Sequence, residues 1–317
     1  MSNAVQVGVV GLGARYARRY RPALLRCRER FVVRAVCDQV QQRALTEAKH
    51  WNCAASAGVL DVLEQPDVEA ILLLDRQWHR LWPLQMACSF GKPVFCCDPL
   101  ACDDAHADEI LQDIEQSKLP VMLAMTPRLA PATDQLRELF NTQLGAPRFL
   151  VCEHARPRQL RQGPGPAAEL NLLGPSATAL LDWCAWLLDG EPQSVLAGTL
   201  GADWLHFLTL ACDDRRGIHI TCRRGPGLRA GVRLHAVADH GSAVVDLPHR
   251  VSWSDGKGEH TLCLRARLSM TDQLLETFWH MVRTGARPEP GVREAYRVLG
   301  WLRAGKRSLR EQRQIAL

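Results

Sequence analysis

The chain has 317 residues, of which 47% are hydrophobic, so it is long enough to bury two cores of ordinary domain size. Its net charge of +5 comes from 39 basic residues, of which only five are lysines, and its 12 cysteines are spread over the whole length. The apolar runs are far shorter than the roughly 20 residues of a membrane helix, and no basic stretch is interleaved with aromatic residues. No apolar targeting segment precedes the first expected strand. We therefore expect a protein of a reducing, cytoplasmic compartment that crosses no membrane and binds no nucleic acid.

Strand-like and helix-like segments alternate through the first 125 residues. The run Val5–Val10 is apolar and largely β-branched, as in a strand that is buried on both faces, and a helical stretch interrupted at Pro22 follows it. Further strands are expected at residues 31–37, 68–74, 94–97 and 121–125, with helices at 40–50, 58–64, 80–90 and 104–117. This alternation predicts parallel strands with right-handed crossovers, so residues 1–125 are expected to form a doubly wound Rossmann domain.

The rhythm changes after Met125, and residues 126–317 are expected to form a second, α+β domain. Its predicted elements are helices at 131–140 and 176–188, separated by a strand at 148–154 and a Gly/Pro-rich stretch at 162–167. Strand-like runs follow at 205–212, 217–223, 232–238 and 241–247, and helices at 271–284 and 291–304 close the chain. Turns such as Ser-Asp-Gly-Lys-Gly favour a largely antiparallel, open sheet.

A glycine-rich turn after the first strand predicts a nucleotide site. In Gly11-Leu12-Gly13-Ala14-Arg15-Tyr16, the first glycine permits a tight turn and the second lets a pyrophosphate approach the backbone at a helix N-terminus. Asp38 ends the second strand, where its carboxylate can accept from ribose hydroxyls but would repel a 2′-phosphate. This pattern favours NAD over NADP, although NADP is possible.

One departure weakens this prediction. Tyr16 stands where the dinucleotide fingerprint has a third glycine, so its ring has to find room where helix and strand normally pack closely. The alternative is that the two glycines only serve a tight strand-to-helix turn.

Motifs along almost the whole chain resemble the Gfo/Idh/MocA family of oxidoreductases, which includes glucose-fructose oxidoreductase and inositol dehydrogenase. The matching segments are Pro66–Leu72, His79 at the start of the next helix, Ala87–Val94, Arg128–Pro131, Asp182–Pro192 and Arg307–Glu311. The resemblance implies a Rossmann domain followed by an α+β domain with an open sheet, and an NAD(P)-dependent reaction on a sugar, polyol or similar small molecule. It also implies a homo-oligomer. Together with the glycine-rich turn, it places the cofactor-binding residues at Gly11, Leu12, Gly13, Arg15, Tyr16, Asp38, Leu74, His79, Cys97 and Pro99.

The family's catalytic positions are altered here. Where active members have Glu-Lys-Pro, this chain reads Cys97-Asp98-Pro99, and the positions of an aspartate, an acid/base histidine and a further aspartate become Pro175, Ala179 and Asp182. Oxidation of an alcohol needs a base for the hydroxyl proton, and the reverse reaction needs a donor to the developing alkoxide. Neither Pro175 nor Ala179 can fill these roles, and the Asp98 carboxylate would repel an oxyanion.

His154 is the best substitute acid/base, because it ends a strand beside Glu153 and histidine titrates near neutral pH. A hydrogen-bonded histidine within a sheet is the alternative. Two functions therefore stay open: an oxidoreductase with rearranged catalytic groups, and a catalytically inactive binding protein such as a sensor or partner subunit.

Other clusters have simpler interpretations. Cys88, Cys96, Cys97 and Cys102 lack the spacing of a zinc site and are expected to be small buried hydrophobes, so no metal is expected. Trp183 with Trp186, and Trp78 with Trp82, indicate packing, or else a stacking surface for a sugar. Arg156, Arg158 and Arg161 can clamp an anionic ligand, although a basic loop is the alternative.

Overall fold

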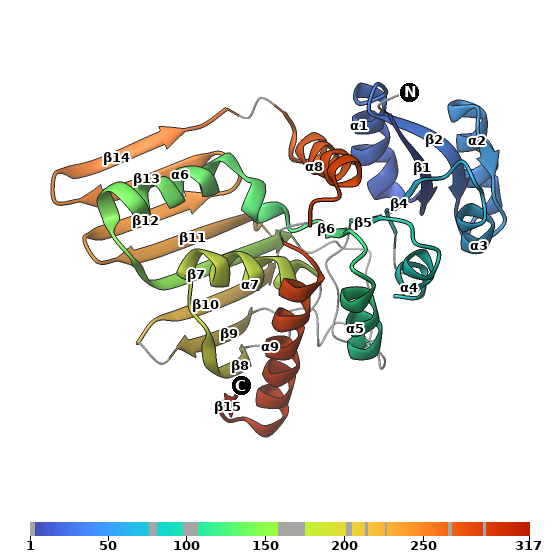
Figure 1. Cartoon of the computed structure of the whole chain (residues 1–317). Helices are drawn as coiled ribbons and strands as arrows, with labels where there is room; N and C mark the ends of the chain where they lie inside the picture. The colour runs from blue at the N-terminus through green and yellow to red at the C-terminus, as the bar shows by residue number, and fades with distance from the viewer. Residues whose placement is uncertain are drawn as a thin grey trace. The chain divides into compact units, whose positions relative to one another are not determined.

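The chain forms two compact units in a computed structural model that describes residues 4–75, 81–97, 107–157, 175–200, 205–212, 215–225, 227–265, 268–287 and 290–317 (Figure 1). The first unit contains residues 1–99, 103–124 and 268–296, and the second contains 100–102, 125–267 and 297–317. A late segment of the chain therefore returns to the first unit, an arrangement that a single division after residue 125 does not describe.

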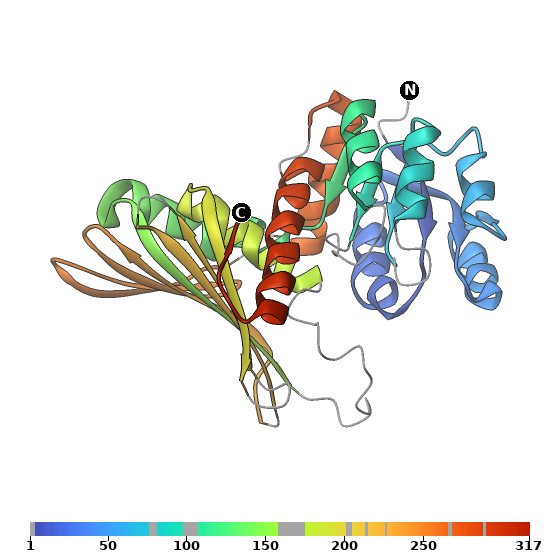
Figure 2. The ribbon, with the colours of Figure 1, turned by 90° about the horizontal axis from the view of Figure 1, so that it is seen from below.

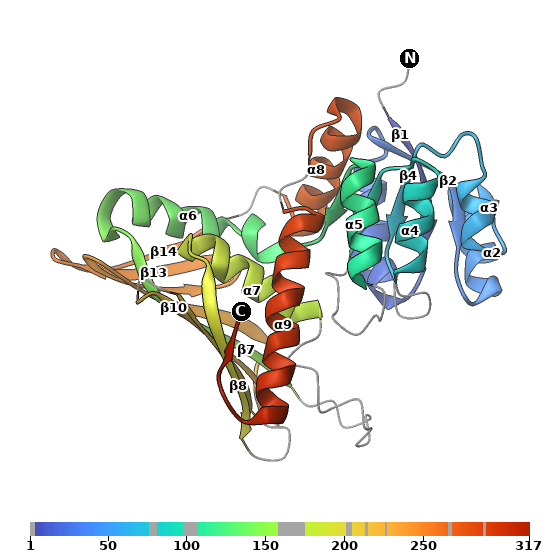
Figure 3. The same cartoon turned by 60° about the horizontal axis from the view of Figure 1, so that its bottom comes forward.

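The first unit is built on a six-stranded parallel sheet with the order β3-β2-β1-β4-β5-β6. This is the strand order of a Rossmann fold, and the order reverses between β1 and β4, where such folds bind their ligands. The strands are β1 (Val5–Val10), β2 (Phe31–Cys37), β3 (Ala54–Ala55), β4 (Ala70–Leu73), β5 (Val94–Cys96) and β6 (Val121–Leu123). The helices are η1 (Tyr16–Tyr20), α1 (Arg21–Arg26), α2 (Gln41–Trp51), α3 (Val59–Leu63), α4 (Trp82–Ser89), α5 (Ala107–Ser117) and α8 (Met270–Thr284), and α4 and α5 lie side by side in Figure 3.

The helix after the glycine-rich turn passes through Pro22 without a break. Residues 14–26 are helical throughout, and η1 is a turn of π-helix in which the Arg21 N–H donates to the Tyr16 carbonyl. Proline has no N–H and its ring crowds the preceding turn, so a widened turn directly before Pro22 accommodates it. The predicted interruption is therefore a local π-turn.

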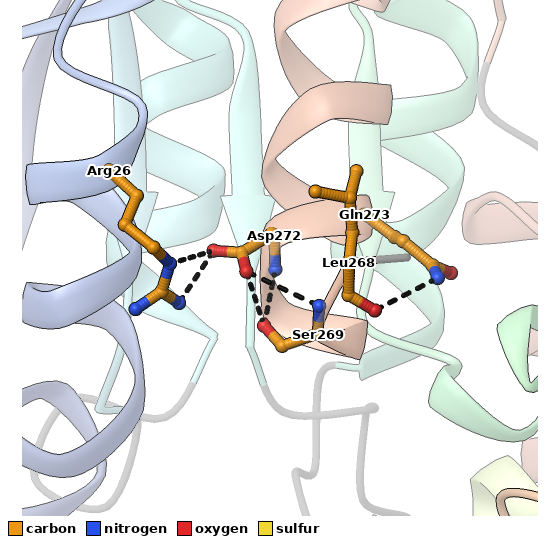
Figure 4. A network of polar contacts seen from close by, with 5 residues as sticks. All are labelled: Arg26, Leu268, Ser269, Asp272 and Gln273. Atoms are coloured by element: carbon orange, nitrogen blue, oxygen red, sulfur yellow. Dashed lines mark hydrogen bonds and ion pairs between the residues drawn. The ribbon is translucent and has the colours of Figure 1, made fainter. Parts of the chain in front are cut away.

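Helix α8 is attached to the first unit by both apolar and ionic contacts. The Phe278 ring lies 5.7 Å from that of Phe95 and 6.4 Å from that of Phe31. Ser269 caps the helix by accepting from the Asp272 N–H at 3.2 Å, and the Arg26 guanidinium of α1 donates to the Asp272 carboxylate at 2.7 Å (Figure 4). Burial alone would raise the pKa of Asp272, but Arg26 and Ser269 hold it below its usual value. The cap and the ion pair thus fix the start of α8 against α1.

The second unit is built on a nine-stranded sheet with the order β14-β13-β12-β11-β7-β10-β9-β8-β15. All its neighbours are antiparallel except the parallel pair β7 and β10. The strands are β7 (Pro147–Pro157), β8 (Pro192–Leu200), β9 (Leu205–Cys212), β10 (Gly217–Gly225), β11 (Gly231–Ala238), β12 (Gly241–Asp246), β13 (Arg250–Asp255), β14 (Gly258–Cys263) and β15 (Ile315–Ala316). The predicted α/β fold, with a largely antiparallel sheet in the C-terminal part, is confirmed.

Helices cover one face of this sheet, as Figure 2 shows for the second unit. They are η2 (Thr126–Leu129), α6 (Pro131–Leu139), η3 (Phe140–Leu144), α7 (Pro175–Leu188) and the part of α9 (Val292–Glu311) from Arg297 onward. Alternate residues such as Leu150 and Cys152 of β7 are buried on the helix side. Large apolar side chains at intervening positions point the other way and are exposed, among them Phe149 of β7 (39%) and Val237 of β11 (52%). In the part of the chain that the structure describes, no helix could cross a membrane.

Candidate functional site

The glycine-rich turn lies at the carboxyl end of β1 and is tightly enclosed. Gly11 has φ +92°, and a Cβ atom there would lie 2.5 Å from both the backbone nitrogen and the Cβ of Asp75. A Cβ atom on Gly13 would lie 3.1 Å from a carboxylate oxygen of the same residue. A Cβ atom at position 11 would clash with the Asp75 backbone, which cannot move aside as a side chain can, so the fold requires glycine there. At position 13 glycine keeps the turn open to a ligand.

Asp38 holds the turn from the neighbouring strand. Its Oδ2 accepts from the Leu12 N–H at 2.6 Å, and its Oδ1 accepts from the Val40 N–H at 2.8 Å. The Arg43 guanidinium lies 3.5 Å from Oδ1. A carboxylate has about four acceptor positions, so Asp38 can still accept from a ribose hydroxyl while it orders the turn.

Tyr16, which replaces the third glycine of the dinucleotide fingerprint, points away from the turn. Its ring is buried, its hydroxyl donates to Glu47 at 2.8 Å, and it accepts from the Trp51 indole N–H at 2.7 Å. Both partners belong to α2, and Arg21 lies 3.2 Å from Glu47. Burial raises the pKa of Tyr16 far above its usual value, so the hydroxyl stays protonated. Tyr16 therefore fastens the first helix to α2, and Gly13 of the turn stays partly exposed.

Leu74, Cys97 and Arg15 lie together at the carboxyl ends of β4 and β5. The Cys97 thiol donates to the Leu74 carbonyl at 3.0 Å, and the Arg15 guanidinium contacts the same sulfur at 3.1 Å. Three other predicted site residues, His79, Asp98 and Pro99, lie outside the described residues. The expectation that Asp98 replaces the family's lysine therefore stays a prediction from the sequence.

The second unit holds the other catalytic candidates on β7 and α7. Ala179 lies on α7 and is buried, so that position has no ionisable group. Pro175 begins α7. Asp182 is fully buried and receives both Nε, at 2.6 Å, and a terminal nitrogen, at 2.5 Å, of Arg128. This pairing gives Asp182 a structural role.

His154 is half-buried on the helix-covered face of β7. Its Nε2 accepts from Arg156 at 3.3 Å, and its Nδ1 lies 3.9 Å from the Cys222 sulfur. Burial lowers the pKa of His154 to about 4, and the Arg156 charge adds to this. At neutral pH the imidazole is therefore uncharged and a weak base, which is far from the matched pKa of an efficient proton shuttle.

The cysteine and tryptophan clusters have structural roles where the structure describes them. Cys96 and Cys97 are buried, Cys88 is half-buried, and Cys102 lies outside the described residues. Among the described side chains, none of the histidine, cysteine and acidic groups is arranged to hold a metal ion. Trp183 is buried, and Trp186 has the guanidinium groups of Arg128 and Arg137 over its ring, at 4.9 and 4.3 Å.

Two features of the nucleotide site were not predicted. Asp75 places a carboxylate against the glycine-rich turn, and Arg43 brings a cation to Asp38. Asp75 lies two residues after the end of β4, the strand next to β1, so its position just after an expected parallel strand was the available signal. Arg43 lies in the first turn of α2, five residues after Asp38. Its closeness to Asp38 could therefore also have been predicted from the sequence.

Comparisons with known proteins agree with this geometry. The GFO_IDH_MocA family model, described as an oxidoreductase family with an NAD-binding Rossmann fold, matches residues 5–125. Inositol 2-dehydrogenase of Gluconacetobacter diazotrophicus is 28% identical over 194 residues, which cover 58% of this chain and 55% of that protein. The chain thus spans about half the length of the curated relatives it matches.

Solved structures share the fold over nearly the whole chain. A putative myo-inositol dehydrogenase from Sinorhizobium meliloti has a TM-score of 0.80 at 18% identity and covers 99% of both chains. A levoglucosan dehydrogenase in complex with NADH and L-sorbose has a TM-score of 0.86 at 14% identity, covering 99% of this chain and 98% of its own. The sequence match to the GFO_IDH_MocA family model covers residues 5–125, and the Rossmann strand order and the glycine-rich turn of the first unit agree with it.

Proposed function

We propose that this protein binds a nicotinamide dinucleotide in its first unit and oxidises or reduces a sugar, polyol or similar small molecule. The observation that carries the proposal is the hydrogen bond from the Leu12 N–H to Asp38. It orders the glycine-rich turn and leaves the Asp38 carboxylate an acceptor position for a ribose hydroxyl. The Gly11–Gly13 backbone would approach the pyrophosphate, and the bound cofactor would supply hydride chemistry. The inositol 2-dehydrogenase relative supports a polyol as the substrate.

NAD is the favoured cofactor. A 2′-phosphate would meet the Asp38 carboxylate, which is buried and held by two backbone N–H groups. Arg43 lies beside this carboxylate and offsets part of that repulsion, so NADP remains a weaker ligand in this proposal.

The test is a calorimetric titration of the full chain with NAD, NADH, NADP and NADPH. Asp38→Ala is expected to weaken NAD binding by about tenfold or more, because it removes a ribose acceptor and frees the turn. Asp75→Asn is expected to act in the opposite direction. It removes a negative charge beside Gly13, where the pyrophosphate would lie, and should tighten NAD binding several-fold. Absence of binding by all four nucleotides would refute the proposal.

A second function is favoured by a specific observation in the second unit. Ala179 cannot exchange a proton, and the pKa of His154, about 4, lies well below neutrality. General acid/base assistance is worth roughly 10²- to 10⁴-fold in rate. The candidate is a nucleotide- or ligand-binding protein, such as a sensor or partner subunit, without turnover. Absorbance of the reduced nicotinamide against a panel of sugars and polyols separates the two functions, and a rate that survives His154→Ala would exclude that histidine as the base.

We also propose a homo-oligomer in the cytoplasm. The open face of the nine-stranded sheet exposes Phe149, Leu196 (40%) and Val237, which a second copy would cover. The described cysteines form no disulfide bond, which suits a reducing compartment. A monomeric mass by light scattering at micromolar concentration would refute the oligomer.

A further inference from the structure

Two cysteine thiols meet where helix α7 packs on strand β7 inside the second unit. Cys152 lies on the helix-covered face of β7, Cys184 lies on α7, and both side chains are fully buried. The two thiols are hydrogen-bonded, and because this bond raises the pKa of Cys152, the Cys152 S–H is the donor and the Cys184 sulfur the acceptor. A small movement of the side chains would therefore bring the sulfurs to bonding distance.

The elements that carry these thiols are held in place on both sides of the pair. Asp182, two residues before Cys184, receives the two-point ion pair of Arg128. Trp183, directly before Cys184, is fully buried. Strand β7 is paired along its length with β10 on one side and β11 on the other. Neither the helix nor the strand can slide without breaking these contacts, so the two thiols stay together in the folded unit.

A third cysteine lies nearby on the neighbouring strand. In the parallel pair of β7 and β10, Cys152 is in register with Ile220, whereas Cys222 is in register with His154. The Cys222 sulfur lies 3.9 Å from His154 Nδ1, and burial raises the pKa of Cys222 to about 12. Cys222 is therefore a competitor for Cys152 that is displaced by two residues along the sheet.

We propose that Cys152 and Cys184 form a redox modification site, at which hydrogen peroxide joins them in a reversible disulfide that ties α7 to β7. The Cys184 sulfur, the acceptor of the hydrogen bond, attacks one peroxide oxygen. An S–O bond forms, the O–O bond breaks, and the first water leaves. The Cys152 sulfur then displaces the hydroxyl group as a second water while the S–S bond forms. Two thiols are oxidised by two electrons in total, which reduce one peroxide to two waters. The site needs no nucleotide, so it is independent of the proposed function.

Burial sets the rate of this reaction. The hydrogen bond to Cys184 and the loss of solvent raise the pKa of Cys152 well above its usual value. A neutral thiol is a weak nucleophile, so the second step is expected to be slow at neutral pH and to need local opening where α7 meets β7. The site therefore responds to sustained exposure to peroxide, and an added dithiol reverses the bond by thiol exchange.

The test is peptide mapping of the full, folded chain after treatment with hydrogen peroxide. Remaining thiols are blocked with N-ethylmaleimide, and the digest is read by tandem mass spectrometry with and without dithiothreitol. We expect a peptide pair linked through Cys152 and Cys184 that dithiothreitol separates. Because the bond closes a loop of about 30 residues, it should also raise the melting temperature of the second unit by about 5 °C or more.

Cys222→Ala is the matched control, since it removes a neighbouring thiol of the same unit. It should keep both the linked peptides and the rise in melting temperature, whereas Cys152→Ala should lose both. The inference is overturned if the unaltered chain keeps Cys152 and Cys184 free, or if Cys152 links to Cys222. It is also overturned if the Cys152–Cys184 link forms no faster in the folded chain than in urea, because folding then does not bring the thiols together. The map of the unaltered chain decides the matter even if Cys152→Ala does not fold.

Discussion

Replacing Asp182 with alanine is expected to destabilise the second unit by about 3–5 kcal/mol. Arg128 and Asp182 form a two-point ion pair whose side chains are 9% and 0% exposed. Removing the carboxylate leaves a guanidinium that is largely buried and charged, with the Trp186 ring against its face. The measurement is urea unfolding followed by tryptophan fluorescence, with the transition of each unit fitted separately.

Two further variants make this prediction specific to the burial of charge. The double variant Arg128→Met with Asp182→Ala removes both charges and should be more stable than Asp182→Ala, because no unpaired ion remains. Arg297→Ala breaks an exposed pair with Glu191, whose side chains are 41% and 65% exposed, and should cost at most about 1 kcal/mol. If Asp182→Ala costs no more than Arg297→Ala, the buried pair does not stabilise the unit.

Gly11→Ala is expected to have the second large effect, on both stability and nucleotide binding. The positive φ costs an alanine about 1–3 kcal/mol, and its Cβ would stand 2.5 Å from the Asp75 backbone nitrogen. The turn must then shift, which displaces the Leu12 N–H from Asp38. We expect NAD affinity to fall by more than about tenfold, alongside a lower melting temperature of the first unit.

Gly13→Ala is the control for that variant. Its Cβ would meet only a carboxylate oxygen, at 3.1 Å, and that oxygen can rotate away. It should change stability by less than about 1 kcal/mol. Equal destabilisation by the two variants would contradict the requirement for glycine at position 11.

The first unit was predictable because its signals are local. Buried parallel strands read as continuous apolar runs, so Val5–Val10 and Phe31–Cys37 were located to the residue. The open sheet of the second unit was harder to predict, because its strands are half-exposed and mixed in composition. Strand β14, whose residues are mostly exposed, has no apolar pattern to detect.

The candidate site was predictable only where one residue determines the geometry. The glycine-rich turn and Asp38 were found from sequence, but the partners of Tyr16 were not, because Glu47 and Trp51 are reached through the tertiary packing of α2. Arg128 and Asp182 are 54 positions apart in the sequence. Nothing in the two motifs that contain them indicates that the two side chains pair. His154 was expected to end its strand, but β7 continues to Pro157. The depressed pKa of His154 depends on burial that a sequence does not show.

The return of α8 to the first unit has a consequence for how the chain is made. Phe278 and Asp272, which pack against Phe95 and Arg26, are synthesised only after most of the second unit has left the ribosome. A nascent chain of 125 residues has every strand of the Rossmann sheet but must leave the apolar surface beneath α8 open to water. The first unit is therefore expected to complete its folding late in translation, after residues 125–267 of the second unit have been synthesised.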